Sequence, residues 1–374
     1  MNVTIKEVSS PKDRKRFVRF PNLLFKDNPY YVPKLEKLIL SELNPKKNRA
    51  SAFCDCCCWL ALGTGGRVVG RIAGIINRQN NEQAGAACAR FGFMDFIDDN
   101  AVADALFDTV EEWARKNGMQ LMRGPQEFQE FDAIGLTVDG FDEIPTAYIN
   151  YHAPYYEKQL LRRGYVKDKD YVQYEVVLPD NITDMFASDA NLVAQRCHLH
   201  QADVSSKKKM SAYFRQCPRV LNEMYESVPG FHGITQQLAE DLFRRFNPSL
   251  NLDFVSVVLN EKEEVVAFWF AMPSLSKALQ KLKGKFSTLS YLRILHALRH
   301  NDRLDLLMVG VAKEYQGKGV EAMLFDKIAP QILRYEIKYL ETTLEQEESN
   351  PFKSLWSPFV YRLSKRMRCY TRNL

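Results

Sequence analysis

Runs of apolar residues, or apolar residues alternating with polar ones, recur along this chain, and each pattern predicts a strand. Residues 3–8 and 195–204 alternate with a period of two, which is typical of a half-buried strand. Mostly apolar runs predict buried strands. They lie at 56–62, 67–76, 91–96, 121–124, 252–259, 265–272, 304–311 and 338–344, with further strand pairing up to Leu178.

Helical periodicity separates these predicted strands. Ser9 or Ser10 with Pro11 opens a helix that continues to Phe25. Asp99 or Asn100 caps a second helix, and Gly118 ends it. Further helices are predicted over 182–193, from Lys207, and from Val320 through Ile332.

The chain length and the position of Pro179 together indicate two domains. At 374 residues the chain is too long for one typical domain and suits two of ordinary size. Pro179 follows a complete series of strands and helices, and a comparable series begins after it. We therefore expect a boundary at 178/179.

A glycine-containing loop joins the predicted strand 304–311 to the helix that follows it. Gly317 and Gly319 allow positive φ, so that consecutive N–H groups can face outward at the positive end of the helix. That geometry binds a phosphate or pyrophosphate. Glycine is also common in ordinary turns before helices, so the loop alone leaves both interpretations open.

The residues Gln316-Gly317-Lys318-Gly319, placed after a Val-Gly-Val strand, resemble the acyl-CoA pyrophosphate loop of the GCN5-related N-acetyltransferase (GNAT) superfamily. The chain also resembles a bacterial, two-lobed family of that superfamily. The resemblance implies an α/β (α+β) fold with two tandem GNAT folds, each a mixed, mostly antiparallel sheet flanked by helices. The lobes would be residues 1–178 and 179–374. Glu321 departs from the motif, because the superfamily usually has a small residue there.

The resemblance also implies which residues contact the cofactor, acetyl-CoA or another acyl-CoA. In this family the pantetheine arm inserts between two strands that splay apart, here 304–311 and 338–344. The implied cofactor-binding residues are Val309, Val311, Gln316, Gly317, Lys318, Gly319 and Val320.

The first lobe lacks the phosphate loop but keeps another part of the pattern. Residues 97–101 contain two carboxylates and no glycine where the superfamily binds diphosphate. Residues 150–166 resemble the closing helix, which implies Tyr156 as a general acid. In the second lobe, after Asn350, Trp356 and Ser357 replace this tyrosine.

Two further catalytic residues are expected in the second lobe. Tyr361 lies one turn from the position of the missing tyrosine, and Glu341 is the leading carboxylate for a base that acts through water. The predicted catalytic residues are thus Glu341, Tyr156 and Tyr361.

The implied function is an N-acyltransferase that moves an acyl group, expected to be acetyl, from acyl-CoA to an amine by direct attack. The acceptor would be a small molecule or a peptide. Two alternatives remain open at this point. One is an aminoacyl-tRNA-dependent transferase of similar two-lobed fold, and the other is a degenerate pair of lobes that serves as a binding or scaffold protein.

Composition narrows these classes. The net charge of +5 favours an anionic cofactor but is far from the strongly basic signature of nucleic-acid binders, so no specific nucleic acid is expected. No signal peptide or membrane span is evident, and we expect a cytoplasmic protein.

Cys54, Cys56, Cys57 and Cys58 lack metal-site spacing and are interpreted as reduced core residues. His198 and His200 have no evident partner ligand, so no metal is expected.

Residues 274–303 form a basic, amphipathic insertion between two predicted strands. Its leucines recur at helical spacing beside lysines and arginines, with Gly284 dividing two short helices. Such a stretch can make weak contact with an anionic membrane. The preferred interpretation is that its leucines pack onto the lobes and that it walls the acceptor side of the cleft.

Overall fold

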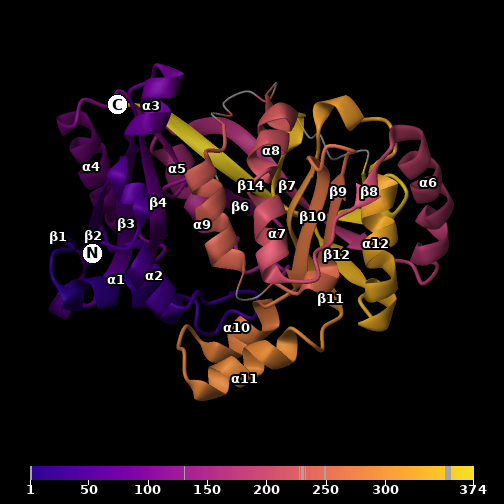
Figure 1. Cartoon of the computed structure of the whole chain (residues 1–374). Coiled ribbons are helices and arrows are strands. Elements are labelled where there is room, and N and C mark those ends of the chain that lie inside the picture. The colour runs from indigo at the N-terminus through magenta and orange to yellow at the C-terminus, as the bar shows by residue number, and fades with distance from the viewer. Residues whose placement is uncertain are drawn as a thin grey trace. The chain divides into compact units, whose positions relative to one another are not determined.

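The computed structural model describes residues 2–129, 131–226, 228, 231, 233–247, 250–349 and 355–374. The chain divides into two compact units (Figure 1). Unit 1 comprises residues 1–172, 275–294 and 364–374, and unit 2 comprises 173–274 and 295–363. Compared with the expected boundary at 178/179, unit 1 also takes in part of the insertion and the C-terminal segment. The assignment of 1–178 and 179–374 as functional lobes stays a prediction.

Unit 1 is built on a sheet whose neighbouring strands follow the order β1-β2-β3-β4-β5-β14, with β6 also paired to β14. Among the described residues of this unit, only β4 and β5 pair in parallel. The strands are β1 (Thr4–Glu7), β2 (Cys54–Leu62), β3 (Val68–Asn77), β4 (Cys88–Phe96), β5 (Leu121–Gly124), β6 (Leu136–Asp139) and β14 (Val360–Asn373), whose first residues belong to unit 2.

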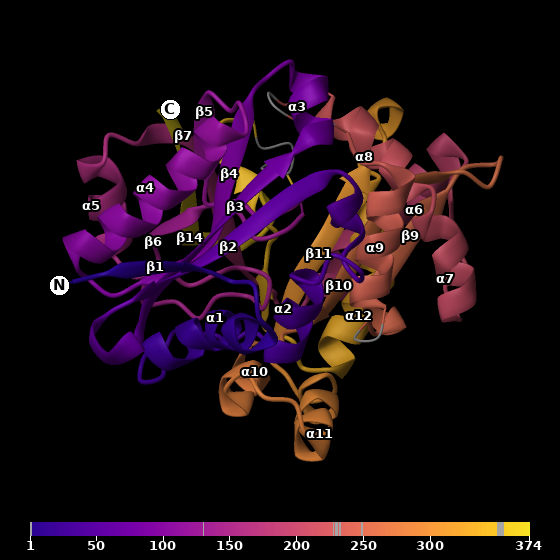
Figure 2. The same cartoon turned by 90° about the vertical axis from the view of Figure 1, so that its left-hand side faces the viewer.

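Helices cover both faces of this sheet (Figure 2). Helix α4 (Asn100–Lys116) packs Leu106 and Val110 into one core, and α1 (Pro11–Leu24) packs Phe17 and Val18 into the core on the other face. As expected, Asp99 caps α4 and Ser10 caps α1. The other helices of unit 1 are α2 (Glu36–Glu42), α3 (Arg78–Ala84), α5 (Tyr155–Arg162), α10 (Ser276–Leu282) and the first part of α11 (Thr288–Ala297).

Unit 2 has its own series of neighbouring strands, in the order β7-β12-β11-β10-β9-β8, with β13 paired to β7. Here β11 and β12 are the parallel pair. The strands are β7 (Val166–Val177, which begins in unit 1), β8 (His200–Gln201), β9 (Val255–Leu259), β10 (Val265–Pro273), β11 (Arg303–Val311), β12 (Tyr339–Glu341) and β13 (Glu345–Gln346).

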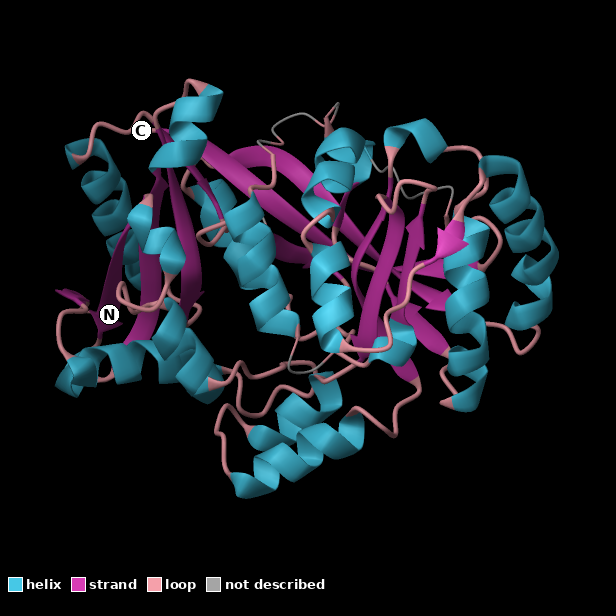
Figure 3. Ribbon diagram, viewed as in Figure 1, coloured by secondary structure: helices cyan, strands magenta, loops and turns pink. Residues whose placement is uncertain are grey.

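Two groups of helices pack on the strands of unit 2 (Figure 3). Helix α12 (Glu321–Arg334) places Phe325 against Trp269 of β10 and against Phe186 of α6 (Ile182–Cys197). On the opposite face Phe214 of α7 packs against Phe270 of β10. This second group consists of α7 (Lys207–Phe214), α8 (Cys217–Tyr225) and α9 (Gln236–Phe246).

Two segments differ from the sequence-based expectation. The alternating pattern over 195–204 was expected to form a strand, and this prediction is wrong for most of the segment. Helix α6 continues through Cys197, because its buried residues keep a helical period, and His198 ends it with a left-handed φ of 53°. Only His200–Gln201 form strand β8. The long C-terminal strand β14 was not predicted.

Candidate functional site

The loop between β11 and α12 in unit 2 contains backbone donors for which the described chain supplies no acceptor. Gly317 and Gly319 both have positive φ, 71° and 82°, as expected for a loop that turns N–H groups outward. Helix α12 starts at Glu321 without a side-chain cap. Within the described chain, the N–H groups of Gly317, Gly319 and Val320 have no protein acceptor. Three free donors therefore coincide with the positive end of a helix dipole.

The remaining residues of this loop have distinct surroundings. Gln316 Nε2 donates to the Val311 carbonyl at 3.1 Å and so ties the loop to the end of β11. Val320 is fully buried and so anchors the end of the loop in the protein interior. The Lys318 side chain is exposed and lies over the Tyr315 ring. Glu321, the residue that departs from the motif, is half-buried in the first turn of α12.

Helix α6 adds a cation that the sequence pattern did not reveal. Arg196 Nη2 donates to the Lys318 carbonyl at 2.6 Å, and its side chain is otherwise exposed. Because α6 packs along α12, Arg196 is held beside the glycine loop. No spacing rule connects residues 122 positions apart, so only the packing of the two helices identifies it.

Strands β11 and β12 diverge in front of this loop. They pair only from Arg303 to Asp305 and from Tyr339 to Glu341. Beyond Asp305, β11 carries an irregularity in its pairing with β10 and continues to Val311 along β10 alone. The expected splay of the two strands is thus present in the described residues.

Backbone groups of β11 point into the space that opens between these strands. The N–H of Ala312 donates to the Val266 carbonyl at 2.7 Å, which makes these two residues a hydrogen-bonded pair. Because such pairs alternate along an antiparallel ladder, Val309 and Val311 belong to the non-hydrogen-bonded positions. Their N–H and C=O groups consequently face away from β10, toward the edge that β12 has left.

Three carboxylates form a row across the strands at the point of divergence. Asp305 of β11 is opposite Glu341 of β12, and Glu341 is opposite Glu175 of β7, so all three side chains share one face of the sheet. Arg303 Nη1 donates to Glu341 at 2.9 Å and also to Glu175. Arg362 Nε donates to Glu175 at 2.8 Å. Burial opposes ionisation of Glu175, but these hydrogen bonds outweigh it and lower its pKa.

Asp305 is the exception in this row. It is 1% exposed, and in the part of the chain that the structure describes neither of its carboxylate oxygens has a hydrogen-bond partner of good geometry. Burial raises its pKa to about 7, the nearby Ser274 hydroxyl and Arg303 oppose the shift, and the charge of Glu341 adds to it. A carboxyl group with a pKa near 7 can accept a proton at neutral pH.

The predicted catalytic residues lie in different environments. Glu341 is buried and held by Arg303, in the carboxylate row of unit 2. Tyr361 is partly exposed on β14, with its ring 5.3 Å from that of Tyr174. Tyr156 is fully buried in unit 1, and burial raises its pKa well above the usual value of a tyrosine. Asn350, which marks the break in the second-lobe pattern, lies outside the described residues.

In unit 1 the backbone groups that correspond to the free N–H groups of unit 2 already have hydrogen-bond partners within the chain. Asp99 Oδ1 accepts hydrogen bonds from the N–H groups of Ala101 and Val102, so the start of α4 is already capped by a carboxylate. At the end of β4 the Tyr156 hydroxyl accepts the Phe96 N–H at 3.0 Å, while the Tyr155 hydroxyl donates to the Phe96 carbonyl. The groups that are free in unit 2 are thus occupied in unit 1.

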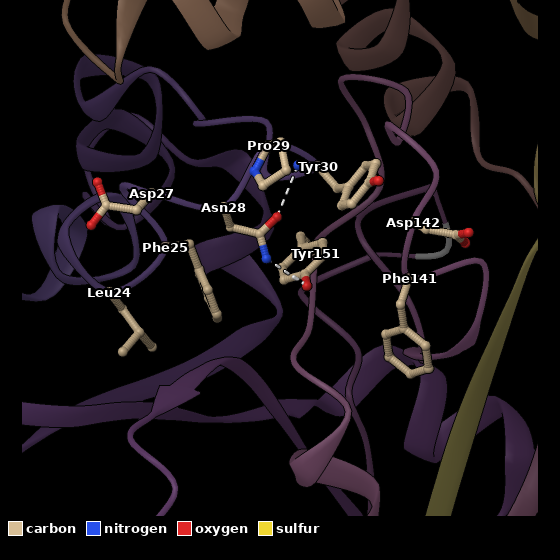
Figure 4. Close-up of a pocket in the computed structure, with 9 residues that line it drawn as sticks. All are labelled: Leu24, Phe25, Asp27, Asn28, Pro29, Tyr30, Phe141, Asp142 and Tyr151. Carbon is tan, nitrogen blue, oxygen red and sulfur yellow. Dashed lines mark hydrogen bonds between the residues drawn. The ribbon is translucent and has the colours of Figure 1, made fainter.

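Unit 1 also has a shallow pocket of about 590 Å³, walled by aromatic side chains (Figure 4). Asn28 donates to the Tyr151 hydroxyl at 2.7 Å and accepts the Tyr30 N–H at 2.8 Å. Since Asn28 and Tyr151 pair with each other, the hydrogen bonds here hold the loop after α1 in place. Asp27 and Asp142 lie exposed at its rim.

The structure shows where the cysteines of β2 and the two histidines near β8 lie. Cys54 is buried, whereas Cys56 is exposed, so the cysteines of β2 serve as core residues only in part. His198 and His200 lie near Glu261 and Glu263, at 3.8 and 3.2 Å. Over the described residues, no group of three or more His, Cys, Asp or Glu side chains is arranged to hold a metal ion.

Comparison with known proteins gives two relatives that extend over most of the chain. Protein YghO of Escherichia coli (strain K12) is 22% identical over 377 residues, which cover 97% of this chain and 93% of that protein. The bacterial ceramide synthase of Caulobacter vibrioides (strain NA1000 / CB15N) is 26% identical over 328 residues, covering 84% and 82%. No protein-family model matches the chain.

Solved structures agree on the fold. A tandem GNAT protein from the clavulanic acid biosynthesis pathway superposes with a TM-score of 0.57 at 12% identity, covering 100% of this chain and 98% of that one. A GCN5-related N-acetyltransferase from Sphaerobacter thermophilus superposes with a TM-score of 0.52 at 9% identity, covering 99% and 95%. The resemblance carried by the loop at Gln316–Gly319 is therefore confirmed at the level of the fold: this chain has the tandem fold of the GCN5-related N-acetyltransferases.

Proposed function

We propose that this protein is an acyl-CoA-dependent N-acyltransferase whose donor site lies in unit 2. The observation that carries the proposal is the uncapped start of α12, with free N–H groups at Gly317, Gly319 and Val320, at the end of a strand that diverges from its neighbour. A pyrophosphate is the ligand that such a helix start favours. Arg196 and Lys318 would add positive charge beside it.

The length of the open edge also suits this donor. From Val311 back to Asp305, β11 runs for six residues, which corresponds to roughly 20 Å. That span is comparable with an extended pantetheine arm. With the pyrophosphate on the loop and the arm along Val309 and Val311, the thioester would come near Asp305.

Asp305 is the proposed general base. The amine nitrogen attacks the thioester carbonyl, the new N–C bond forms and the C–S bond breaks. The proton that the amine loses passes to Asp305, directly or through water, and the thiolate takes up a proton as CoA leaves. Glu341 is engaged by Arg303, so its proposed part is electrostatic, through its effect on the pKa of Asp305. Roles for Tyr156 and Tyr361 as acids remain predictions.

The relatives bear on the acyl group and the acceptor. Ceramides are N-acyl amides, so similarity to a ceramide synthase over 84% of the chain supports acyl transfer to an amine. It also favours a longer acyl chain than the acetyl group that the family resemblance led us to expect. CoA itself tests the donor site independently of the acyl chain.

The test compares two glycine variants by thermal unfolding with and without CoA. At a concentration one hundred times the dissociation constant, CoA should stabilise the wild-type protein by about 2.7 kcal/mol. Gly319→Val should lose this stabilisation, because a β-branched residue at φ 82° distorts the loop. Gly66→Val is the matched control, since Gly66 has φ 73° in a hairpin of unit 1. Equal CoA stabilisation of both variants would overturn the proposal.

A further inference from the structure

The two helices of the basic insertion differ in how they use their apolar residues. In α10, Leu275, Leu279 and Leu282 are buried, as the preferred interpretation of the sequence predicted. Around α11 the expectation fails. Phe286, Tyr291 and Leu292 are 52%, 55% and 59% exposed.

The exposed apolar residues of α11 gather on one side of the helix. Tyr291, Leu292 and Leu295 follow each other at helical spacing, whereas Ser290, on the other side, is buried. Leu295 is itself only half-buried. The helix thus packs through the side that carries Ser290 and the half-buried Ile294 and Ala297, and it leaves Tyr291 and Leu292 exposed on the other side.

The charged residues within this segment all have one sign. From residue 275 to 301 there is no Asp or Glu, and the six basic residues there, Lys277, Lys281, Lys283, Lys285, Arg293 and Arg299, are all exposed. Among the described residues, Lys281, Lys283 and Lys285 form no ion pair. A strongly basic rim around exposed aromatic and aliphatic side chains is therefore available to an anionic partner.

The segment is firmly attached through α10. Ser276 Oγ donates to the Pro145 carbonyl at 2.7 Å, and Gln280 Nε2 donates to the Pro29 carbonyl at 2.7 Å. The Gly284 carbonyl accepts the Glu36 N–H at 2.9 Å, and a side chain at Gly284 would collide with Asn22. These contacts all lie within unit 1, and Arg293 Nη1 donates to the Lys281 carbonyl at 3.2 Å, so the first part of α11 is attached to the segment around α10.

We propose that the segment from Lys281 to Arg293 docks on the surface of a bilayer that contains anionic lipids. Phe286, Tyr291 and Leu292 would enter the boundary between headgroups and acyl chains, and the lysines and Arg293 would lie at the lipid phosphates. In the described part of the chain no helix is long and apolar enough to cross a membrane, so the contact is peripheral. A bilayer fits better than a protein partner, because single-sign charge around aromatic residues complements an anionic interface without specific pairing. This inference does not depend on the proposed enzymatic activity.

Flotation of the full-length protein with vesicles tests the proposal. We expect the wild type to float with vesicles that contain about one-third phosphatidylglycerol and to remain at the bottom with pure phosphatidylcholine. Raising the salt should weaken the binding to anionic vesicles, because the Debye length shortens.

Two matched pairs of variants separate the charge and apolar contributions. Lys281→Glu with Lys285→Glu should lower the partition coefficient at least tenfold, since each basic residue near the lipid contributes on the order of fivefold. The control is Lys207→Glu with Lys208→Glu, which changes the net charge equally on exposed residues of α7. Leu292→Ser should lower partitioning several-fold, and Leu192→Ser on α6, a leucine with 61% exposure, should leave it unchanged.

Three results would overturn the proposal. One is the absence of flotation with anionic vesicles at low salt. Another is an equal loss of vesicle binding in the two double lysine variants, which would mean that net charge alone drives binding. The last is full retention of binding in Leu292→Ser, which would remove the apolar contact and point to a soluble anionic or protein partner instead.

Discussion

At the scale of single residues, the chemistry of the site depends on which carboxylate lacks a partner. Glu175 and Glu341 accept hydrogen bonds from Arg303, whereas Asp305, in the same row, is buried with both oxygens unpaired within the described residues. A charged group in that position is costly, and such a cost is common at catalytic sites.

The raised pKa of Asp305 leads to a prediction about how the folding stability of the protein depends on pH. Its folded-state pKa of about 7 is above the usual pKa of an aspartate, so the folded protein binds more protons between these two pKa values and its stability falls as pH rises through that window. Asp305→Asn should therefore be more stable than the wild type at pH 8, by roughly 2–4 kcal/mol, and similar to it below pH 4. Urea unfolding at several pH values measures this difference.

The same substitution should reduce activity. If Asp305 is the general base, Asp305→Asn should lower kcat/KM at pH 8 by about 10²- to 10⁴-fold and abolish the acidic limb of the pH profile. A variant that gains stability at pH 8 but keeps its activity would show that Asp305 is buried without a catalytic part.

Replacing Glu321, in contrast, is expected to strengthen the binding of CoA. A carboxylate about 5 Å from a pyrophosphate, at an effective dielectric near 20, costs roughly 3 kcal/mol per unit charge before screening. Glu321→Ala should therefore tighten CoA binding, more at low salt than at high salt. Calorimetric titration at two salt concentrations provides the measurement, and weaker binding would mean that Glu321 assists the site.

At the scale of elements, the two helices that connect the parallel strands, α4 between β4 and β5 and α12 between β11 and β12, begin differently. In unit 1 the start of α4 is closed by Asp99, while in unit 2 the start of α12 is open behind two glycines of positive φ. The dipole of each helix favours negative charge at this end. In unit 1 Asp99 supplies that charge and accepts the free N–H groups, whereas in the described part of unit 2 no side chain caps α12, which leaves its N–H groups for the proposed ligand.

This contrast predicts the effect of removing the cap. Asp99→Ala should destabilise the protein by about 1 kcal/mol, because two N–H groups of α4 lose their acceptor. CoA affinity should not change. Asp98→Ala removes the same charge from an exposed neighbour and should leave stability nearly unchanged. A lower CoA affinity in Asp99→Ala would place part of the donor site in unit 1.

At the scale of the whole molecule, one of the two units is proposed to bind the acyl donor. The Phe96 backbone groups and the start of α4 are occupied in unit 1, whereas in the described part of unit 2 the N–H groups before α12 have no protein acceptor. We therefore expect one CoA per chain in a calorimetric titration. A stoichiometry of two would mean that ligand binding displaces Tyr155, Tyr156 or Asp99, and Asp99→Ala would then raise the affinity of the second site.

Local patterns along the chain were sufficient for most of the elements of this protein and for the glycine loop. The loop could be predicted because Gly317 and Gly319 encode positive φ in themselves, and the apolar run of β11 and the helical period of α12 place it between a strand and a helix. The cap at Asp99 followed from the same kind of local rule. Asp305 could also have been noticed, as the one charged residue within the apolar run 304–311.

Other features were decided only by tertiary packing. Strand β14 is too rich in basic residues to form an apolar run, although the buried Met367 and Cys369 alternate with Arg366 and Arg368, and β5 and β6 supply its hydrogen bonds. Arg196 approaches the loop only because α6 packs on α12. The unpaired state of Asp305 depends on strand register, which aligns it with Glu341 and Glu175 and directs Arg303 to the other two. Exposure of α11 likewise depends on which side of the helix is packed, and its amphipathic pattern alone was compatible with either side.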